Sequence, residues 1–217
     1  MTSPSIRVVI ADDHTILREG LRQLLDSADD LHVVAEAADG HQVMARVRAE
    51  DFDVLILDLS MPGKSGIELI KQVKAEKPKL RVLVLSMHEE AQYAVRAIKA
   101  GASGYVTKDS AGTQLLTAIR KVAGGGAFIS AEVAEQLALG AMPGADGPPH
   151  ARLSDREYEV FQLLVAGASV TDIAARLNLS GKTVSTHKAR LMEKLGIANQ
   201  ADLVRYAMRH NLASDAG

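Results

Sequence analysis

Val54-Leu55-Ile56-Leu57-Asp58-Leu59-Ser60 is the segment that most clearly indicates the fold of this chain. Its four consecutive aliphatic residues predict a strand that is buried on both faces, as in a parallel sheet. The strand ends in a carboxylate, and a buried ionised acid without a partner is costly. Met61-Pro62-Gly63 then ends the strand. Asp58 is therefore expected at the carboxyl end of a central strand, where open α/β sheets bind their ligands.

Four further strands flank this stretch, and each is followed by a helix with an apolar stripe of helical period. The predicted strands are 7–11, 31–37, 81–85 and 104–107, and the predicted helices are 14–28, 40–50, 66–76, 91–100 and one capped by Ser110. Strands that alternate with helices of this length predict right-handed crossovers and a parallel sheet covered on both faces. The first 125 residues are thus expected to form an α/β domain.

Polar side chains follow these strands, and in a parallel sheet they emerge at one edge. They are Asp12, Asp13, Asp58, Ser86 and Lys108. Carboxylates gathered around one point require a cation, and oxygen ligands of this kind suit Mg²⁺. Lys108 and Ser86 can bind a phosphoryl group, and Asp58 is the expected nucleophile for phosphoryl transfer. The alternative is that Asp12 and Asp13 cap the first helix and Lys108 forms a structural ion pair, but the convergence of five groups favours a phosphate and metal site.

Length and composition limit the remaining possibilities. The 217 residues suggest one large or two small domains, and the absence of Cys excludes disulfides and thiolate metal sites. No charged leader is evident and no apolar run approaches the ~20 residues of a membrane helix. We therefore expect a cytoplasmic protein without a membrane partner. Residues 1–150 carry 16 Lys and Arg against 20 Asp and Glu, whereas residues 151–217 carry 9 against 7, which is weak support for a nucleic-acid partner of the second half.

A second domain is predicted from residue 150 to 217. Residues 126–149 hold a short helix at 130–139 and a Pro/Gly-rich linker. Ser154 with Glu157 forms a capping box that begins a helix ending at Ala166. Two helices, 170–177 and 182–195, then flank a tight turn, which is typical of a helix-turn-helix unit spanning about 169–195. A last helix is expected at 200–210, so this domain is small and all-α.

One face of the helix at 182–195 is suited to a DNA groove. Val184, Leu191 and Leu195 share the inward face, and the opposite face carries small or polar residues flanked by basic ones. The predicted DNA contacts are Lys182, Thr183, Ser185, Thr186, Lys188, Ala189, Arg190 and Lys194. Strong direct readout of bases uses bidentate Arg, Asn or Gln pairs. We therefore expect modest discrimination for each half-site, with the lysines binding phosphates and with dimerisation and DNA shape adding specificity.

Residues 1–125 resemble the receiver domain of bacterial two-component response regulators. The matching motifs are Asp12-Asp13, Asp58 with Met61-Pro62-Gly63, Ser86, and Tyr105-x-x-Lys108. The resemblance implies a flavodoxin-like, doubly wound five-stranded sheet of order 2-1-3-4-5, with Asp58 accepting phosphate from a sensor histidine kinase or a small phosphodonor. It further implies that Asp13, Asp58 and the Ser60 carbonyl hold Mg²⁺, with Asp12 acting through water. Ser86 and Lys108 are then expected to bind the phosphoryl group, and Tyr105 is expected to turn inward as Ser86 moves.

Residues 150–213 are similar to the LuxR-type DNA-binding domain of the NarL/FixJ subfamily. The resemblance is carried by Leu153-Ser154-x-Arg156-Glu157, Ile173-Ala174, Ser180-x-Lys182-Thr183-Val184-x-x-His187 and Lys194-Leu195. It implies a transcriptional regulator that binds promoter DNA and forms a homodimer when phosphorylated, with RNA polymerase as a further candidate partner. We expect the resting receiver to cover the recognition helix or the dimerising surface, and the last helix to dimerise through Leu203, Val204 and Ala207.

Two other functions remain open at the level of sequence. An aspartate-nucleophile phosphatase typically has a second acid two residues after the nucleophile, and that position here is Ser60. A regulator that binds DNA independently of phosphorylation is the other alternative, although the intact acidic set argues against it. The chain is thus expected not to be an enzyme, apart from the self-phosphorylation and autodephosphorylation of Asp58. Ser60 and His88 are hypothesised to set the lifetime of the phosphoryl group, because a small Ser60 leaves room for an attacking water.

Overall fold

The computed structural model describes residues 5–61, 66–87, 91–140, 148–210 and 212. Three parts of the predictions lie outside these residues. They are the turn residues Pro62 and Gly63, the linker stretch 141–147, and His88, which is hypothesised to affect the lifetime of the phosphoryl group. The N-terminal part contains β1 (Ile6–Ala11), α1 (Thr15–Asp26), β2 (Leu31–Ala37), α2 (Gly40–Ala49), β3 (Val54–Asp58), α3 (Gly66–Glu76), β4 (Arg81–Ser86), α4 (Ala91–Lys99), β5 (Gly104–Thr107) and α5 (Ala111–Ala123). The rest contains α6 (Ala131–Gly140), the 3-10 helix η1 (Pro149–Arg152), α7 (Asp155–Val165), α8 (Val170–Leu177), α9 (Gly181–Leu195) and α10 (Gln200–Arg209).

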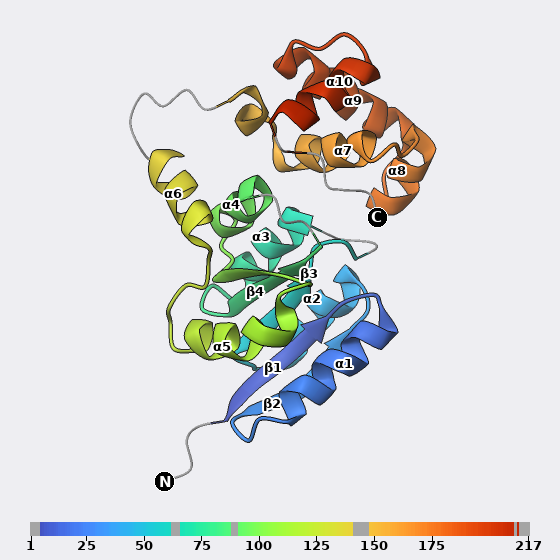
Figure 1. The fold of residues 1–217 in the computed structure, drawn as a ribbon. Coiled ribbons are helices and arrows are strands. Elements are labelled where there is room, and N and C mark those ends of the chain that lie inside the picture. Colours follow the sequence, from blue (N-terminus) through green and yellow to red (C-terminus); the bar gives the residue numbers. More distant parts are fainter. Residues whose placement is uncertain (1–4, 62–65, 88–90, 141–147, 211, 213–217) are drawn as a thin grey trace.

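The five strands form one parallel sheet in the order β2-β1-β3-β4-β5, which confirms the predicted doubly wound α/β fold. β3 is central and buried along its whole length, as its aliphatic run predicts. One core cluster joins the sheet to α1 and α5, and the other joins its opposite face to α2, α3 and α4 (Figure 1). The carboxyl ends of all five strands therefore lie at the same edge of the sheet.

The predicted element boundaries agree with the structure to within one or two residues at nearly every end. One capping prediction is wrong in its chemistry. Ser110 occupies the N-cap position of α5, but within the described residues its side chain makes no capping hydrogen bond to the helix. The Ser110 hydroxyl instead donates to the Thr107 carbonyl at 3.1 Å, because its backbone already has helical dihedral angles and directs the side chain away from the following amides.

The C-terminal helices form as their caps and apolar residues predict. Ser154 and Glu157 make the reciprocal capping box at the start of α7. Ser180 accepts a hydrogen bond from the backbone N–H of Thr183 and so begins α9. The inward face of α9 is buried at Val184, Leu191 and Leu195. These contacts place α8 and α9 against α7, in the arrangement of a helix-turn-helix unit.

The two parts of the chain contact each other through α3 and α4 on one side and η1 and α7 on the other. The rings of Tyr93 and Tyr158 lie 5.7 Å apart across this boundary, and one core cluster continues from the sheet into the C-terminal helices. Figure 1 shows α7 on the side of the helical part that faces α3 and α4. We call this contact between α3, α4, η1 and α7 the interdomain interface. None of the helices in the described part of the chain is long and apolar enough to cross a membrane.

Candidate functional site

An ammonium group bridges two buried carboxylates at the carboxyl edge of the sheet. Lys108 Nζ lies 2.9 Å from Asp58 Oδ2 and 2.7 Å from Asp12 Oδ2. Asp58 ends β3 and Asp12 follows β1, while Lys108 follows β5, so three separate strands position the three charges. All three side chains are buried. The structure thus brings together the groups that the sequence places at separate strand ends.

Burial and the ion pairs act in opposite directions on these groups. Burial raises the pKa of Asp58, while the hydrogen bonds from Lys108 and the Ser60 backbone work against that rise. Burial alone would lower the pKa of Lys108, but its hydrogen bonds to Asp12 and Asp58 raise it overall. Lys108 therefore remains a fixed positive charge beside the Asp58 carboxylate, which favours the approach of an anionic group to this edge.

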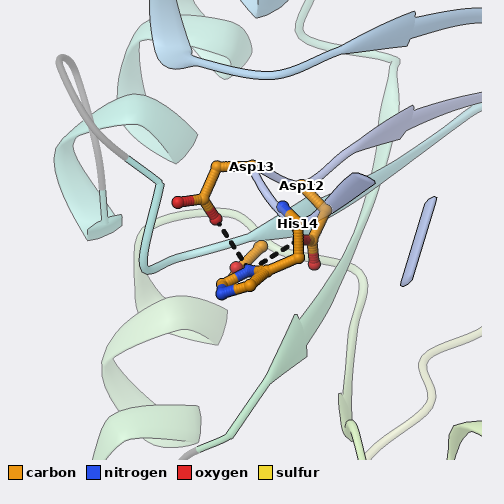
Figure 2. Close-up of side chains that lie close together, drawn as sticks. Asp12, Asp13 and His14 are labelled. Atoms are coloured by element: carbon orange, nitrogen blue, oxygen red, sulfur yellow. Dashed lines mark hydrogen bonds and ion pairs between the residues drawn. The ribbon is translucent and has the colours of Figure 1, made fainter. Parts of the chain in front are cut away.

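Asp12, Asp13 and His14 lie close together at the same edge of the sheet, with the His14 ring against both carboxylates (Figure 2). His14 Nδ1 lies 3.1 Å from Asp12 Oδ1 and 3.0 Å from Asp13 Oδ1. The residue at the N-cap of α1 is His14, which makes no side-chain capping bond among the described residues. Asp12 and Asp13 therefore do not occupy the N-cap position, although Asp12 Oδ1 accepts a hydrogen bond from the backbone N–H of His14 at 2.8 Å. The ion pair of that alternative is present, because Lys108 bridges Asp12 and Asp58. Sequence reasoning did not single out His14, although an imidazole directly after two acids is a recognisable signal.

The donor set at this edge fits a divalent cation. One ligand atom from each of Asp12, Asp13, His14 and Asp58 lies within 4.8 Å of the others. Three of the four residues offer carboxylate oxygens, which are the ligands that Mg²⁺ prefers. Receiver domains generally bind Mg²⁺ at an acidic pocket of this kind. Lys108 holds Asp12 and Asp58 together, whereas Asp13 is exposed.

The remaining predicted pocket residues line the same edge. The Ser60 backbone N–H donates to Asp58 Oδ1 at 2.9 Å, which orients the carboxylate. Ser86 ends β4 and is fully buried, directly beside the β3 strand that carries Asp58. Tyr105 in β5 is also buried, so it is not an exposed aromatic at a strand edge. Ser86 and Tyr105 lie on the neighbouring paired strands β4 and β5, where Ser86 pairs with Thr107 and Tyr105 pairs with Val84.

The predicted DNA-contacting face of α9 is accessible in the full chain. Lys182, Ser185, Thr186, Ala189 and Arg190 are exposed, and Thr183 and Lys188 are partly exposed. Lys194 differs from the expectation, since its Nζ lies 2.6 Å from the buried carboxylate of Glu157. This ion pair ties α9 to the cap of α7. The sequence did not reveal it because Lys194 and Glu157 are far apart along the chain.

Two expectations about the C-terminal helices are contradicted in part. Leu203 and Ala207 of α10 are fully buried within their own domain, so they are not free to form a dimer contact, whereas Val204 is partly exposed and Met208 is exposed. Among the described residues, the receiver contacts η1 and α7 and leaves the predicted DNA-contacting residues of α9 exposed or partly exposed, so it does not cover the recognition helix; masking of a dimerising surface stays a prediction. Both errors arise because a helical wheel identifies the apolar face without identifying its partner.

Comparison with known proteins agrees with this fold and pocket. The family described as "Response regulator receiver domain" matches residues 8–120, and "Bacterial regulatory proteins, luxR family" matches residues 151–207. Together with the parallel sheet and the acidic pocket, these matches define a two-domain regulator with a DNA-binding domain. The chain belongs to the response regulator family, in the NarL/FixJ subfamily with a LuxR-type helix-turn-helix domain.

Relatives and solved structures align over nearly the whole chain. The response regulator UvrY of Escherichia coli O6:H1 is 34% identical over 210 residues, or 96% of each chain. A structure of the response regulator RcsB of Salmonella typhimurium is 34% identical with a TM-score of 0.76, covering 98% of this chain and 100% of that one. RcsB of Salmonella enterica serovar Typhimurium bound to promoter rprA with the phosphomimetic BeF3- is 34% identical with a TM-score of 0.68, covering 93% and 98%.

Proposed function

We propose that this protein is a transcriptional regulator controlled by phosphorylation of Asp58. A sensor histidine kinase is the expected phosphodonor, and a receiver domain implies such a partner. The nearest structural support is the bridged trio of Asp12, Lys108 and Asp58, because it holds a nucleophilic carboxylate beside a fixed cation in a buried pocket. RcsB has been solved on promoter DNA with a phosphomimetic, which supports the same link between receiver and DNA.

The proposed reaction transfers one phosphoryl group to the protein. An Asp58 carboxylate oxygen forms a P–O bond while the P–N bond of the kinase phosphohistidine breaks, and the released imidazole takes up a proton. Asp13, Asp58 and the Ser60 carbonyl would hold Mg²⁺, with Asp12 acting through water, and the ion would neutralise charge on the phosphoryl oxygens. Lys108 and the Ser86 hydroxyl bind those oxygens in the product, and Tyr105 follows Ser86.

Promoter binding is assigned to α9. Lys182 and Lys188 bind phosphates, and Thr183, Ser185, Thr186, Ala189 and Arg190 face the groove. Lys194 is a weaker candidate for a phosphate contact because its charge is already paired with Glu157. Phosphorylation would promote a homodimer, whose paired half-sites supply the specificity that this small, polar face lacks. We place the receiver at residues 1–125, the connecting segment at 126–149 and the DNA-binding domain at 150–217, in a cytoplasmic protein.

The deciding experiment is phosphorylation of the full chain by a small phosphodonor, read by intact mass and by promoter DNA mobility shift. Wild type is expected to gain one phosphoryl group with Mg²⁺ present and to bind DNA more tightly. Asp58→Asn should do neither. Asp109→Asn is the matched control, since Asp109 is an exposed carboxylate next to Lys108 and should behave as wild type.

Three outcomes would overturn this function. Equal labelling of Asp58→Asn and wild type would place the phosphate elsewhere. DNA binding that is identical with and without the phosphoryl group would favour a regulator that acts independently of phosphorylation. Repeated turnover of a phosphomonoester, instead of stoichiometric, alkali-labile labelling, would favour a phosphatase.

A further inference from the structure

Arg96 of α4 reaches from the receiver domain into the start of the DNA-binding domain. Its Nη1 donates to the Leu153 carbonyl at 2.8 Å and to Asp155 Oδ1 at 3.2 Å, and its Nη2 donates to the His150 carbonyl at 2.9 Å. The side chain is only 9% exposed. One guanidinium group therefore joins α4 to both the end of η1 and the beginning of α7.

The acceptors of Arg96 are two backbone carbonyls and one carboxylate of the DNA-binding domain. The His150 carbonyl also accepts from the Leu153 backbone N–H at 3.3 Å, and Arg96 adds a second donor to it while it binds the Leu153 carbonyl. The planar fork of an Arg offers several donors at once, which a Lys cannot reproduce. The guanidinium carbon also lies 4.3 Å from the centre of the Tyr158 ring, a stabilising cation–π arrangement. The receiver thus adds hydrogen bonds to the DNA-binding domain at this point.

Two ion pairs and a buried acid extend the interdomain interface. Lys71 of α3 lies 2.6 Å from Asp155 Oδ2, so Asp155 is bound by one cation from each of α3 and α4. The buried carboxylate of Glu159 accepts a hydrogen bond from the backbone of Ile67 at the start of α3. A side chain at Gly66 would collide with Glu159, which shows how closely the two helices approach. Both receiver helices follow strands that end in the pocket, at Asp58 and at Ser86.

The same contacts leave the recognition helix accessible. α7 lies between the receiver and α9 (Figure 1), and the predicted groove-facing residues of α9 are exposed or partly exposed in the full chain. This arrangement therefore cannot control DNA binding by covering α9. What the interface determines is the orientation of the domain that carries α9.

We propose that Arg96 anchors the DNA-binding domain to the receiver in the unphosphorylated chain, so that the receiver controls the orientation of an open recognition helix. The link between this anchor and phosphorylation of Asp58 rests on the proposed function. β4 ends at Ser86 and α4 begins at Ala91. The helix that carries Arg96 therefore follows the strand that ends beside Asp58.

The anchor is tested by hydrogen exchange on the unphosphorylated full chain, without DNA or phosphodonor. Arg96→Gln is expected to speed exchange of amides in residues 150–159 about tenfold or more. Arg96→Lys, which keeps the charge but loses the fork, should show most of this increase. Lys99→Gln is the matched control, because Lys99 is an exposed cation on the same helix. Preserved protection in β3 and β4 checks that the receiver stays folded.

Unchanged protection of residues 150–159 in both Arg96 variants would overturn the anchor. The open recognition helix is tested separately, by lysine acetylation of the same unphosphorylated chain. Lys182 should react as fast as the exposed Lys99; if Lys182 reacts slowly and becomes fast in Arg96→Gln, α9 is covered and the proposal is wrong. Neither measurement involves Asp58 chemistry, so failure of the anchor and failure of the proposed function are distinguishable.

Discussion

Lys108→Met tests the electrostatics of the pocket most directly. The variant keeps the length of the side chain and removes the one charge that lies between Asp12 and Asp58. At 2.9 and 2.7 Å, each ion pair has a Coulomb attraction of about 6 kcal/mol at an effective dielectric constant of about 20. The cost of desolvation offsets much of this attraction, and removing one partner of a buried pair typically costs about 3–5 kcal/mol. We expect the receiver domain to lose about 3 kcal/mol of stability.

Calorimetry of the full chain, with EDTA and with excess Mg²⁺, measures this loss. Without metal, the receiver transition of Lys108→Met should fall by roughly 10 °C. A cation bound at a hundredfold excess over its Kd restores about 2.7 kcal/mol. Because the variant leaves two carboxylates facing each other, Mg²⁺ should raise its Tm by more than it raises that of wild type.

Lys99→Met is the control for the loss of a lysine in general, since Lys99 is exposed on α4. Its Tm should stay near that of wild type with and without Mg²⁺. The reasoning is refuted if Lys108→Met and Lys99→Met melt together in EDTA, or if Mg²⁺ stabilises Lys108→Met no more than wild type. Either result would mean that Lys108 does not offset the repulsion between Asp12 and Asp58.

Two further predictions concern pH and the lifetime of the phosphoryl group. Burial, with His210 and Arg96 nearby, lowers the pKa of His150 from 6.5 to about 4. The unfolded chain therefore binds this proton first, so stability is complete above the unfolded pKa and falls as the pH drops from 6.5 toward about 4, by roughly 3 kcal/mol in all. Calorimetry across this range should show a flatter dependence in His150→Gln but not in His32→Gln, a change at an exposed position; equal slopes in all three proteins would contradict this. Ser60→Asn should slow loss of the phosphoryl group from Asp58 by about tenfold, or about 1.4 kcal/mol in the barrier, because the larger side chain excludes water. Mass measurements over time follow this loss, with Asp109→Asn as the control. An unchanged rate in Ser60→Asn would contradict the prediction.

The fold was predictable because its signals are local. Four aliphatic residues in a row identify β3, and apolar residues at helical spacing identify α1 to α5, since burial on two faces or one stripe leaves a direct trace in the sequence. The pocket was predictable for a related reason. Parallel strands that run in the same direction all end at one edge of the sheet. Recognising the strands was therefore enough to place Asp58, Ser86 and Lys108 at the same edge.

The contacts between distant charges were not predictable in the same way. Sequence reasoning did not single out Arg96, and it did not reveal that Lys194, a predicted DNA contact, also pairs with Glu157. A helical wheel shows which residues point outward, but it does not show what lies opposite them. For the same reason Leu203 and Ala207 were expected at a dimer contact, although both are buried within their own domain.

The order of the βα units, the acidic edge that contains Asp58 and the inward face of α9 follow from the amino-acid sequence alone. Hydrophobic periodicity and strand direction are properties of short stretches, and they can be recognised without knowledge of the packing. The folded structure is needed to see that Lys108 bridges Asp12 and Asp58, that Arg96 joins the two domains and that α9 is accessible. Those outcomes depend on distances between residues far apart in the chain, and such distances are set by how whole helices pack against one another.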